Sequence, residues 1–238
     1  MAHPTPYVRD ARLSDFDEMA AFSALAFAGD PEMNWFAGLT TALVDAPPAQ
    51  NSHGLRNLEV FMDYINRSVH VAGGRLTVVA IPQADGGEKL VAFAAWVPPG
   101  KNIDSTMTLI RAKGYRSVWT WGLSVAWRAG VVFKPTINGL VVEITATDPE
   151  YQGKGYAGML MRENEAHIDD SKPITLEATT THSRDVYARL GFEVIQSLTL
   201  GKGDVNQYGL KVKDRDAASG FTVWIMIKWP KERVTVKE

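Results

Sequence analysis

The stretch that decides the fold is "YQGKGYAGML", residues 151–160, which follows a strand-like run and opens a helix-like one. Two glycine spacings overlap in it. Gly153, Gly155 and Gly158 form G-x-G-x-x-G, while residues 152–157 form Q-x-x-G-x-A. In both patterns, glycines after a strand let the backbone approach a diphosphate, and N–H groups at the next helix N-terminus bind its charge. The sequence therefore predicts an anion site here.

The two spacings differ in the ligand that carries the diphosphate. The first is typical of a dinucleotide-binding turn, and Glu177 even supplies an acid about 20 residues further on. In such a turn, however, the glycines follow the strand almost at once, whereas residues 148–152 intervene here. The residues after Glu177 offer two strand candidates and one short helix, too little for the second half of a doubly wound fold. We therefore favour the second spacing, a pyrophosphate cradle for coenzyme A.

Composition limits the class of partner. The chain has 238 residues, 45% of them hydrophobic, and is most simply one domain, 1–238. Its 25 Lys and Arg against 27 Asp and Glu leave no basic surplus for nucleic acid or an anionic membrane. The absence of cysteine excludes thiolate metal sites and an acyl-cysteine intermediate. The five histidines show no paired metal spacing, so we expect no metal and a small-molecule partner.

The start of the chain and its apolar stretches bear on localisation. Residues 1–18 are charged and contain no apolar core of a secretory signal. The longest charge-free apolar stretch that invites a membrane interpretation, residues 117–127, is far shorter than the roughly 20 residues that a membrane-spanning helix needs. We therefore expect a cytoplasmic protein that makes no membrane contact.

Hydrophobic periodicity predicts a chain of mixed elements. We expect strands over 6–9, 75–82, 89–99, 140–149, 173–178, 192–200 and 221–229. We expect helices over 14–27, with Ser14 as its cap, and over 55–71, 154–169 and 183–190. Segment 101–135 is expected to be a helical insert and 201–220 a long polar loop. This order indicates an α/β (α+β) sandwich.

Two motifs together point to a family. The segment "ITATDPEYQGKGYAGML" and the later "LEATTTHSRDVYARLGFEV" resemble the GNAT superfamily of acyl-CoA N-acyltransferases. The resemblance is strong over residues 140–195 and extends elsewhere only to the order of elements. It implies a mixed, mostly antiparallel central sheet splayed after the fourth strand, with helices on both faces and the insert between strands 3 and 4. Acetyl-CoA would lie in the opening.

The resemblance also implies a cofactor site. The backbone of one strand segment would pair with the pantetheine amides: Thr145, Ala146 and Thr147. The main-chain N–H groups of the next segment would hold the pyrophosphate: Gly153, Lys154, Gly155, Tyr156 and Ala157. Gln152, Gly158 and Ser183 complete the implied set, although Ser183 is equally suited to cap the helix that follows it.

Two residues are candidates for proton transfer. Tyr187 in "VYARLGF" matches the position where many members of the family carry a tyrosine general acid, and the alternative is a tyrosine packed in the core. Strand alternation places Glu143 on one face with residues 141 and 145. The resemblance implies that Glu143 is the candidate base, because some GNAT enzymes that act on arylalkylamines carry an ionisable residue at the matching strand position. Other members of the family place a glutamate where this chain has Val141. A structural carboxylate paired with a neighbouring Arg or Lys is the alternative for Glu143.

The acceptor side is expected in "FAGDPEMNWF", residues 27–36, and in the insert. Asp30 and Glu32 could attract a cationic amine, with Trp35 flanking it. Alternatively, Asp30 could cap a helix begun by Pro31, with Trp35 in the core. The aromatic residues of the insert are expected to serve mostly in packing, with one or two lining a pocket: Tyr115, Trp119, Trp121 and Trp127.

The leading hypothesis is transfer of an acetyl group from acetyl-CoA to a small-molecule amine, by direct attack in a ternary complex. Two alternatives stay open at the level of sequence. One is a protein or peptide N-acetyltransferase, for which the near-neutral charge is uninformative. The other is a non-catalytic acyl-CoA-binding sensor.

Overall fold

The computed structural model describes residues 5–98, 100, 101, 103, 105–122, 141–167 and 172–230, and for 141–144 the backbone only. Its strands are β1 Tyr7–Asp10, β2 Arg75–Pro82, β3 Glu88–Val97, β4 Val141–Thr147, β5 Ile174–Ala178, β6 Glu193–Leu200 and β7 Phe221–Lys228. Its α-helices are α1 Phe16–Ala26, α2 Pro31–Ala37, α3 Pro48–Val71, α4 Thr106–Arg111, α5 Tyr115–Trp121, α7 Tyr156–Glu165 and α8 Thr181–Arg189. Short 3-10 turns are η1 Leu13–Asp15, η2 Leu43–Asp45 and η3 Pro149–Tyr151.

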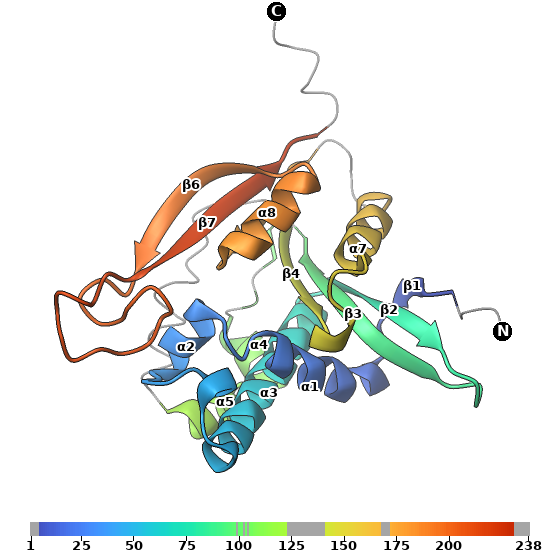
Figure 1. The fold of residues 1–238 in the computed structure, drawn as a ribbon. Coiled ribbons are helices and arrows are strands. Elements are labelled where there is room, and N and C mark those ends of the chain that lie inside the picture. The colour runs from blue at the N-terminus through green and yellow to red at the C-terminus, as the bar shows by residue number, and fades with distance from the viewer. Residues whose placement is uncertain are drawn as a thin grey trace, which may run out of the picture.

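The strands form one seven-stranded sheet in the order β1-β2-β3-β4-β5-β7-β6 (Figure 1). Each neighbouring pair is antiparallel except β4 and β5, which run parallel. The predicted mixed, mostly antiparallel sheet is therefore confirmed. The parallel pair matters for the site, because β4 and β5 are joined by η3 and α7, and the connection crosses at the carboxyl end of β4.

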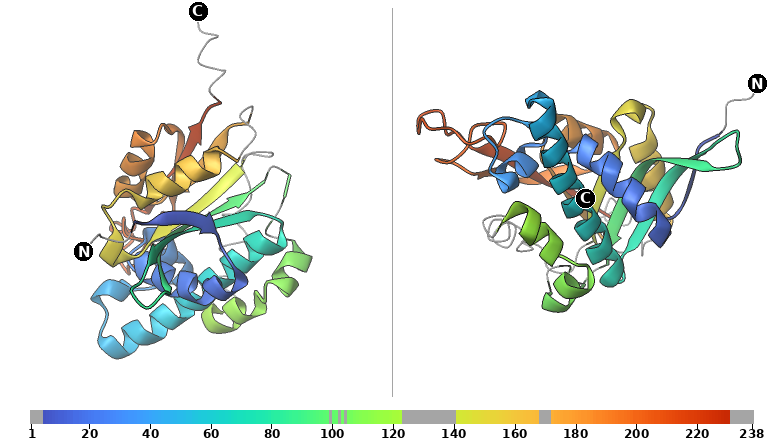
Figure 2. Two further views of the ribbon diagram at one scale, coloured as in Figure 1. Left: turned by 90° about the vertical axis from the view of Figure 1, so that its right-hand side faces the viewer. Right: turned by 90° about the horizontal axis from the view of Figure 1, so that it is seen from below.

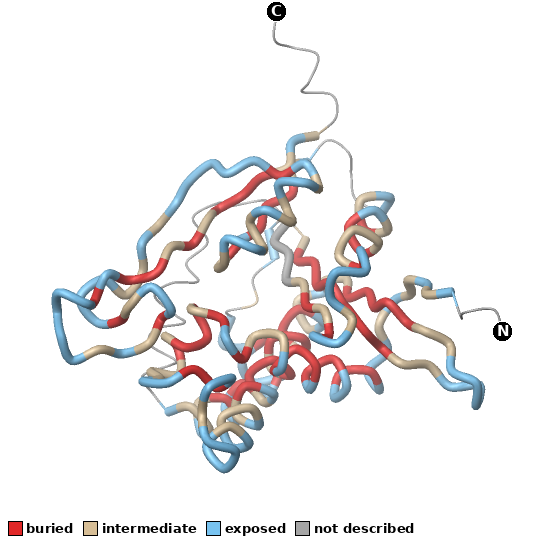
Figure 3. Tube along the Cα trace, in the orientation of Figure 1, coloured by how far each residue is buried: buried red, intermediate tan, exposed pale blue. Residues whose placement is uncertain are grey.

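Helices cover both faces of the sheet, as predicted. Figure 2 shows α7 on one side of the central strands and α1 with α3 on the other. Strand alternation produces the two cores: Val79 packs in the cluster that contains Leu160 of α7, whereas its neighbour Val78 packs in the cluster that contains Met19 of α1. Burial accordingly concentrates in β2, β3 and the inner faces of these helices (Figure 3).

Two predicted helix starts are wrong. Ser14 does not cap a helix, because residues 13–15 form the turn η1 and α1 begins at Phe16. The Asp15 carboxylate is occupied by the Arg12 N–H at 2.6 Å and by the Arg9 guanidinium at 2.7 Å. The second helix, predicted from residue 55, begins at Pro48, since proline at the first helical position needs no N–H partner.

The insert between β3 and β4 is helical where it is described, in α4 and α5. Helix α5 ends at Trp121, because Gly122 has a φ of +81°. The rest of the predicted insert, including Trp127, lies outside the described residues. Packing was expected for most of its aromatic residues. That expectation is wrong for Trp119, which is 91% exposed, and for Tyr115, which is 63% exposed.

The long loop predicted over 201–220 connects β6 to β7 and lies against α2 (Figure 1). The Asn34 side-chain amide donates to the Tyr208 carbonyl at 3.0 Å. Gly209, with a φ of +69°, comes so close that an added Cβ would lie 1.8 Å from the Pro31 carbonyl oxygen. The loop therefore fixes the position of the first turn of α2.

Among the helices that the structure describes, none joins sufficient length to enough apolar character to cross a lipid bilayer.

Candidate functional site

The loop between β4 and α7 has the geometry of an anion cradle. Gly153 and Gly155 take left-handed backbone angles, with φ of +76° and +82°, and Gly155 is the N-cap of α7. No side chain caps this helix, so its first-turn N–H groups have no side-chain acceptor. A Cβ added at either glycine would meet no atom within 4 Å. The open space over a helix N-terminus fits a diphosphate group.

Of the other residues in the predicted cradle, some offer a main-chain N–H group to a ligand and others only pack within the protein. The Tyr156 ring is buried under α7, so only its N–H group is available to a ligand on the loop side. The Ala157 N–H belongs to the same first turn. Gly158 lies against the end of α8, where an added Cβ would be 3.5 Å from Leu190. The nearest atom to that Cβ would be Nη1 of the flexible Arg162 side chain, at 3.2 Å.

The side chains of Gln152 and Lys154 contact neighbouring parts of the protein and so stabilise the loop. The Gln152 amide donates to the Thr147 carbonyl at 3.3 Å and so ties the loop to the end of β4. The Lys154 ammonium lies 4.3 Å from the centroid of the Tyr151 ring and 3.5 Å from the Glu150 carbonyl oxygen. Both partners of Lys154 lie in the preceding turn, η3, so its contacts in the protein stabilise the loop.

The sheet opens beside this cradle. The β4–β5 ladder covers three pairs and ends where Glu143 pairs with Leu176. On its other side β4 continues to pair with β3 as far as Thr147, which is opposite Ala92. Thr145, Ala146 and Thr147 therefore lie beyond the last residue pair that joins β4 to β5. The predicted splay after the fourth strand is confirmed, and it places these three residues along the opening.

Helix α8 follows β5 and carries Tyr187 and Ser183. Its N-cap is Thr180, whose hydroxyl accepts the Ser183 N–H at 3.0 Å, while the Thr180 N–H donates to the Ser183 hydroxyl oxygen at 3.2 Å. Ser183 is thus the third residue of a capping box, and the alternative that Ser183 itself is the N-cap is wrong. The Tyr187 ring is half-buried and meets Phe192 edge-on, with centroids 5.8 Å apart. Its contact with a ligand stays a prediction.

Glu143 is placed by its backbone alone. It pairs with Trp96 on β3 and with Leu176 on β5, at the last pair before the sheet opens. Its side chain lies outside the described part of the structure. Its role as a base therefore stays a prediction.

Comparison with known proteins identifies the segment that contains this site. Residues 129–204 match the family model described as an acetyltransferase (GNAT) domain, and they include β4, the cradle and α8. These residues are therefore similar to GNAT acetyltransferase domains.

The chain is also similar to solved structures, one of which shares its architecture. One is a crystal structure of a histone acetyltransferase HPA2 and related acetyltransferase from Corynebacterium glutamicum ATCC 13032. It is 23% identical with a TM-score of 0.60, over 95% of this chain and 97% of that chain, which establishes the fold. Another is a GNAT superfamily phosphinothricin acetyltransferase from Sinorhizobium meliloti in complex with AcCoA, 16% identical with a TM-score of 0.48, over 94% of this chain and 88% of that chain. A search of curated proteins found no match.

Asp30 and Trp35 both have structural partners. Asp30 is the N-cap of α2 and accepts the N–H groups of Glu32 at 2.9 Å and Met33 at 3.2 Å. The Thr179 hydroxyl donates to its other oxygen. Trp35 is half-buried, with its ring centroid 5.8 Å from that of Phe221. The capping and packing alternatives therefore describe what these residues do within the protein.

Two further carboxylates lie beside Asp30: Glu32, which was expected on the acceptor side, and Glu177, which was not. Glu32 is buried in the first turn of α2, and burial raises its pKa well above the ordinary value of 4.5, with further contributions from the charges of Asp30 and Glu177. Glu177 on β5 reaches solvent, yet the surrounding protein still raises its pKa by burial. The sequence offered one signal for this arrangement, namely an acidic residue inside an otherwise apolar strand.

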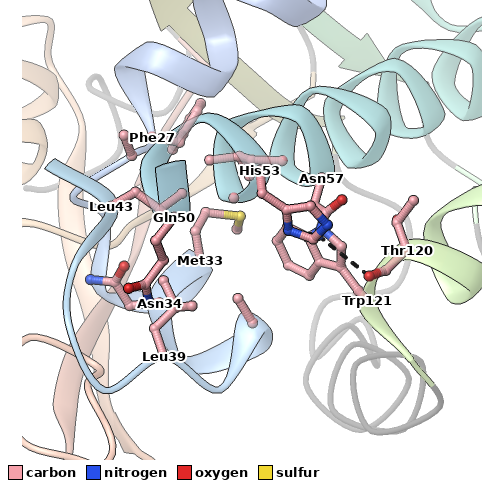
Figure 4. A pocket seen from close by; sticks show the side chains of 14 residues that line it. Phe27, Met33, Asn34, Leu39, Leu43, Gln50, His53, Asn57, Thr120 and Trp121 are labelled. Carbon is pink, nitrogen blue, oxygen red and sulfur yellow. Dashed lines mark hydrogen bonds between the residues drawn. The ribbon is translucent and has the colours of Figure 1, made fainter. Parts of the chain in front are cut away.

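A cavity of about 230 Å³ lies between α2, α3 and α5 (Figure 4). It brings together the two segments expected to select the acceptor, since Met33 and Asn34 line it from α2 and Trp121 lines it from the insert. The Trp121 ring stacks on Phe61 at 5.0 Å between centroids, and its indole N–H has no partner among the described residues. None of the lining residues comes from β4, α7 or α8, so the cavity is separate from the cradle.

Within the described residues, no group of three or more His, Asp or Glu side chains is arranged to hold a metal ion. The three acidic residues near α2 therefore do not form a metal site by their geometry.

Proposed function

We propose that this protein transfers an acetyl group from acetyl-CoA to an amine of a small molecule, by direct attack in a ternary complex. The observation that carries the proposal is the position of the cradle. Its left-handed glycines and uncapped helix N-terminus lie at the end of β4, where the β4–β5 ladder has ended. A site for a diphosphate thus adjoins an opening in the sheet that fits an extended chain.

The cradle would bind acetyl-CoA mainly through main-chain donors. The amides from Gly153 to Ala157 would hold the pyrophosphate, with each charge-assisted hydrogen bond contributing about 1.5–3 kcal/mol. The exposed Lys154 ammonium would add only about 0–1 kcal/mol. The backbone of Thr145 to Thr147 would orient the pantetheine arm along β4. Bound in this way, acetyl-CoA supplies the activated acetyl thioester.

The acceptor must lose a proton before it attacks. An alkylamine with a pKa near 10.4 is uncharged in only about one molecule per thousand at pH 7, which costs about 4–5 kcal/mol. We assign the base to Glu143. Its support is its place at the last β4–β5 pair, which is where the acyl end of a ligand lying along residues 145–147 would arrive.

The departing thiolate of coenzyme A needs a proton in return. We assign that proton to the Tyr187 hydroxyl. Tyr187 lies on helix α8, which follows shortly after β5, and β5 borders the opening on the side opposite β4. General acid catalysis of this kind contributes typically about 10²–10⁴-fold to the rate.

The test is release of free coenzyme A thiol from acetyl-CoA in the presence of panels of small amines, amino acids, polyamines and peptides. The proposal expects release with at least one small amine. Release with peptides alone would indicate a peptide N-acetyltransferase. Binding of acetyl-CoA without release in any panel would indicate a sensor, and both results would overturn the proposal.

A further inference from the structure

Three carboxylates from two distant parts of the chain meet beside the opening of the sheet; we call Asp30, Glu32 and Glu177 the acidic cluster. Asp30 and Glu32 belong to the first turn of α2, and each is only 6% exposed. Glu177 belongs to β5 and reaches solvent. The three are close enough for the charges of Asp30 and Glu177 to act on Glu32.

Strand alternation fixes the side from which Glu177 joins the acidic cluster. Its neighbours Leu176 and Ala178 are buried in the core beneath α7. Successive side chains of a strand point to opposite faces, so Glu177 points to the face covered by α2. Leu176 is also the last β5 residue paired with β4. The acidic cluster therefore lies at the point where the sheet opens.

The carboxylates of the acidic cluster differ in their hydrogen-bond partners. Asp30 is satisfied by two main-chain N–H groups and the Thr179 hydroxyl. Glu32 is different, because its Oε1 atom is shielded from solvent and has no hydrogen-bond partner among the described residues. Nor does any Lys, Arg or His in the described ranges form an ion pair with a member of the acidic cluster.

A buried carboxylate without a partner is unfavourable for folding, because burial removes its hydration and nothing replaces it. Two like charges beside it increase the cost. The fold nevertheless holds α2 in this place, through the Asn34–Tyr208 hydrogen bond and the close contact of Gly209 with Pro31. A bound cation that does not belong to the described residues would give Glu32 the partner that it lacks.

We propose that the acidic cluster is the binding site for the ammonium group of a cationic acceptor, with Glu32 and Glu177 making the charged contacts and Asp30 holding the turn that presents them. This assignment rests on the proposed function, because it names the class of acceptor. It makes a primary alkylammonium or arylalkylammonium compound the expected substrate. A neutral or anionic acceptor would lose the charged contacts and leave Glu32 unpartnered.

The test compares matched cationic and neutral probes by isothermal titration: n-pentylamine against n-pentanol, and 2-phenylethylamine against 2-phenylethanol. The wild-type protein should bind each amine more tightly than its alcohol. Glu32→Gln and Glu177→Gln remove a charge with little change of shape, and each should weaken amine binding by about tenfold or more. Glu59→Gln removes the same charge from the exposed surface of α3 and should leave binding unchanged.

Thermal unfolding separates a ligand site from a structural role. If Glu32 is kept for a ligand, Glu32→Gln should unfold at the same or a higher temperature while losing affinity for the amine. A lower unfolding temperature with amine binding retained would overturn the proposal. Equal affinity of the wild-type protein for the amine and the alcohol in both pairs would also overturn the proposal.

Acetyl-CoA titrations on the same proteins keep the two proposals distinguishable. A wild-type protein that fails to bind acetyl-CoA would refute the proposed function, while a preference for ammonium that depends on Glu32 would still support the acidic cluster. Conversely, thiol release that is unaffected by Glu32→Gln and Glu177→Gln would leave the transferase in place and refute the cluster as its acceptor site.

Discussion

Replacing Gly155 by valine tests the anion cradle directly. Gly155 has a φ of +82° and a ψ of 12°, a conformation that side chains with a Cβ rarely adopt. An added Cβ would meet no protein atom within 4 Å. The substitution therefore combines backbone strain with a side chain in the space where the diphosphate is proposed to lie.

Two magnitudes follow from this geometry. Strain at a left-handed position costs about 1–3 kcal/mol, which lowers the unfolding temperature by about 2–4 °C per kcal/mol in a chain of this length. Loss of two main-chain contacts to the diphosphate, at about 1.5–3 kcal/mol each, weakens binding by roughly 10²-fold or more. Affinity for acetyl-CoA should therefore fall much further than stability.

The assay is isothermal titration with acetyl-CoA, accompanied by thermal unfolding. Gly86→Val is the matched control, because Gly86 has a φ of +84° and equally open surroundings but lies in the turn between β2 and β3. It should lose similar stability and keep its affinity. Lys154→Ala should weaken binding by no more than about fivefold. A larger loss in Lys154→Ala than in Gly155→Val would refute the main-chain cradle.

Three further predictions concern catalysis and stability. Tyr187→Phe should lower the turnover of thiol release by about 10²–10⁴-fold with acetyl-CoA affinity retained, and an unchanged turnover would remove this hydroxyl from the mechanism. Because burial raises the pKa of Glu32 above 4.5, the folded protein binds this proton more tightly than the unfolded chain, so the free energy of unfolding should fall as pH rises above about 4.5. Glu32→Gln should flatten that fall in urea titrations at several pH values, and parallel curves for the two proteins would contradict the assignment. Gly209→Ala should destabilise the protein by about 2–5 kcal/mol in the same assay, because its Cβ would collide with the Pro31 carbonyl as well as strain the backbone. Gly203→Ala, with a similar φ and open surroundings, should cost only the strain, and an equal loss in both variants would argue against the close contact.

Much of the fold follows from local pattern. The predicted strand 75–82 coincides with β2, and the glycine turn after β4 leads into α7 as expected, since alternation and turn-forming residues act over a few neighbouring positions. Helix starts were less predictable. Ser14 is a good N-cap by type, but Arg9, brought close by β1, binds the carboxylate of the neighbouring Asp15 and keeps residues 13–15 in a separate turn.

The backbone form of the proposed cradle could be predicted from the sequence, because it depends on angles that glycines at 153 and 155 permit and on the helix that begins next to them. The acidic cluster was decided by the tertiary structure. Asp30 and Thr179 are separated by 149 positions in the chain, and only the packing of α2 against the end of β5 joins them. Periodicity reports which face of an element is buried, but the partner that each buried carboxylate meets, or lacks, depends on elements brought together from distant parts of the chain.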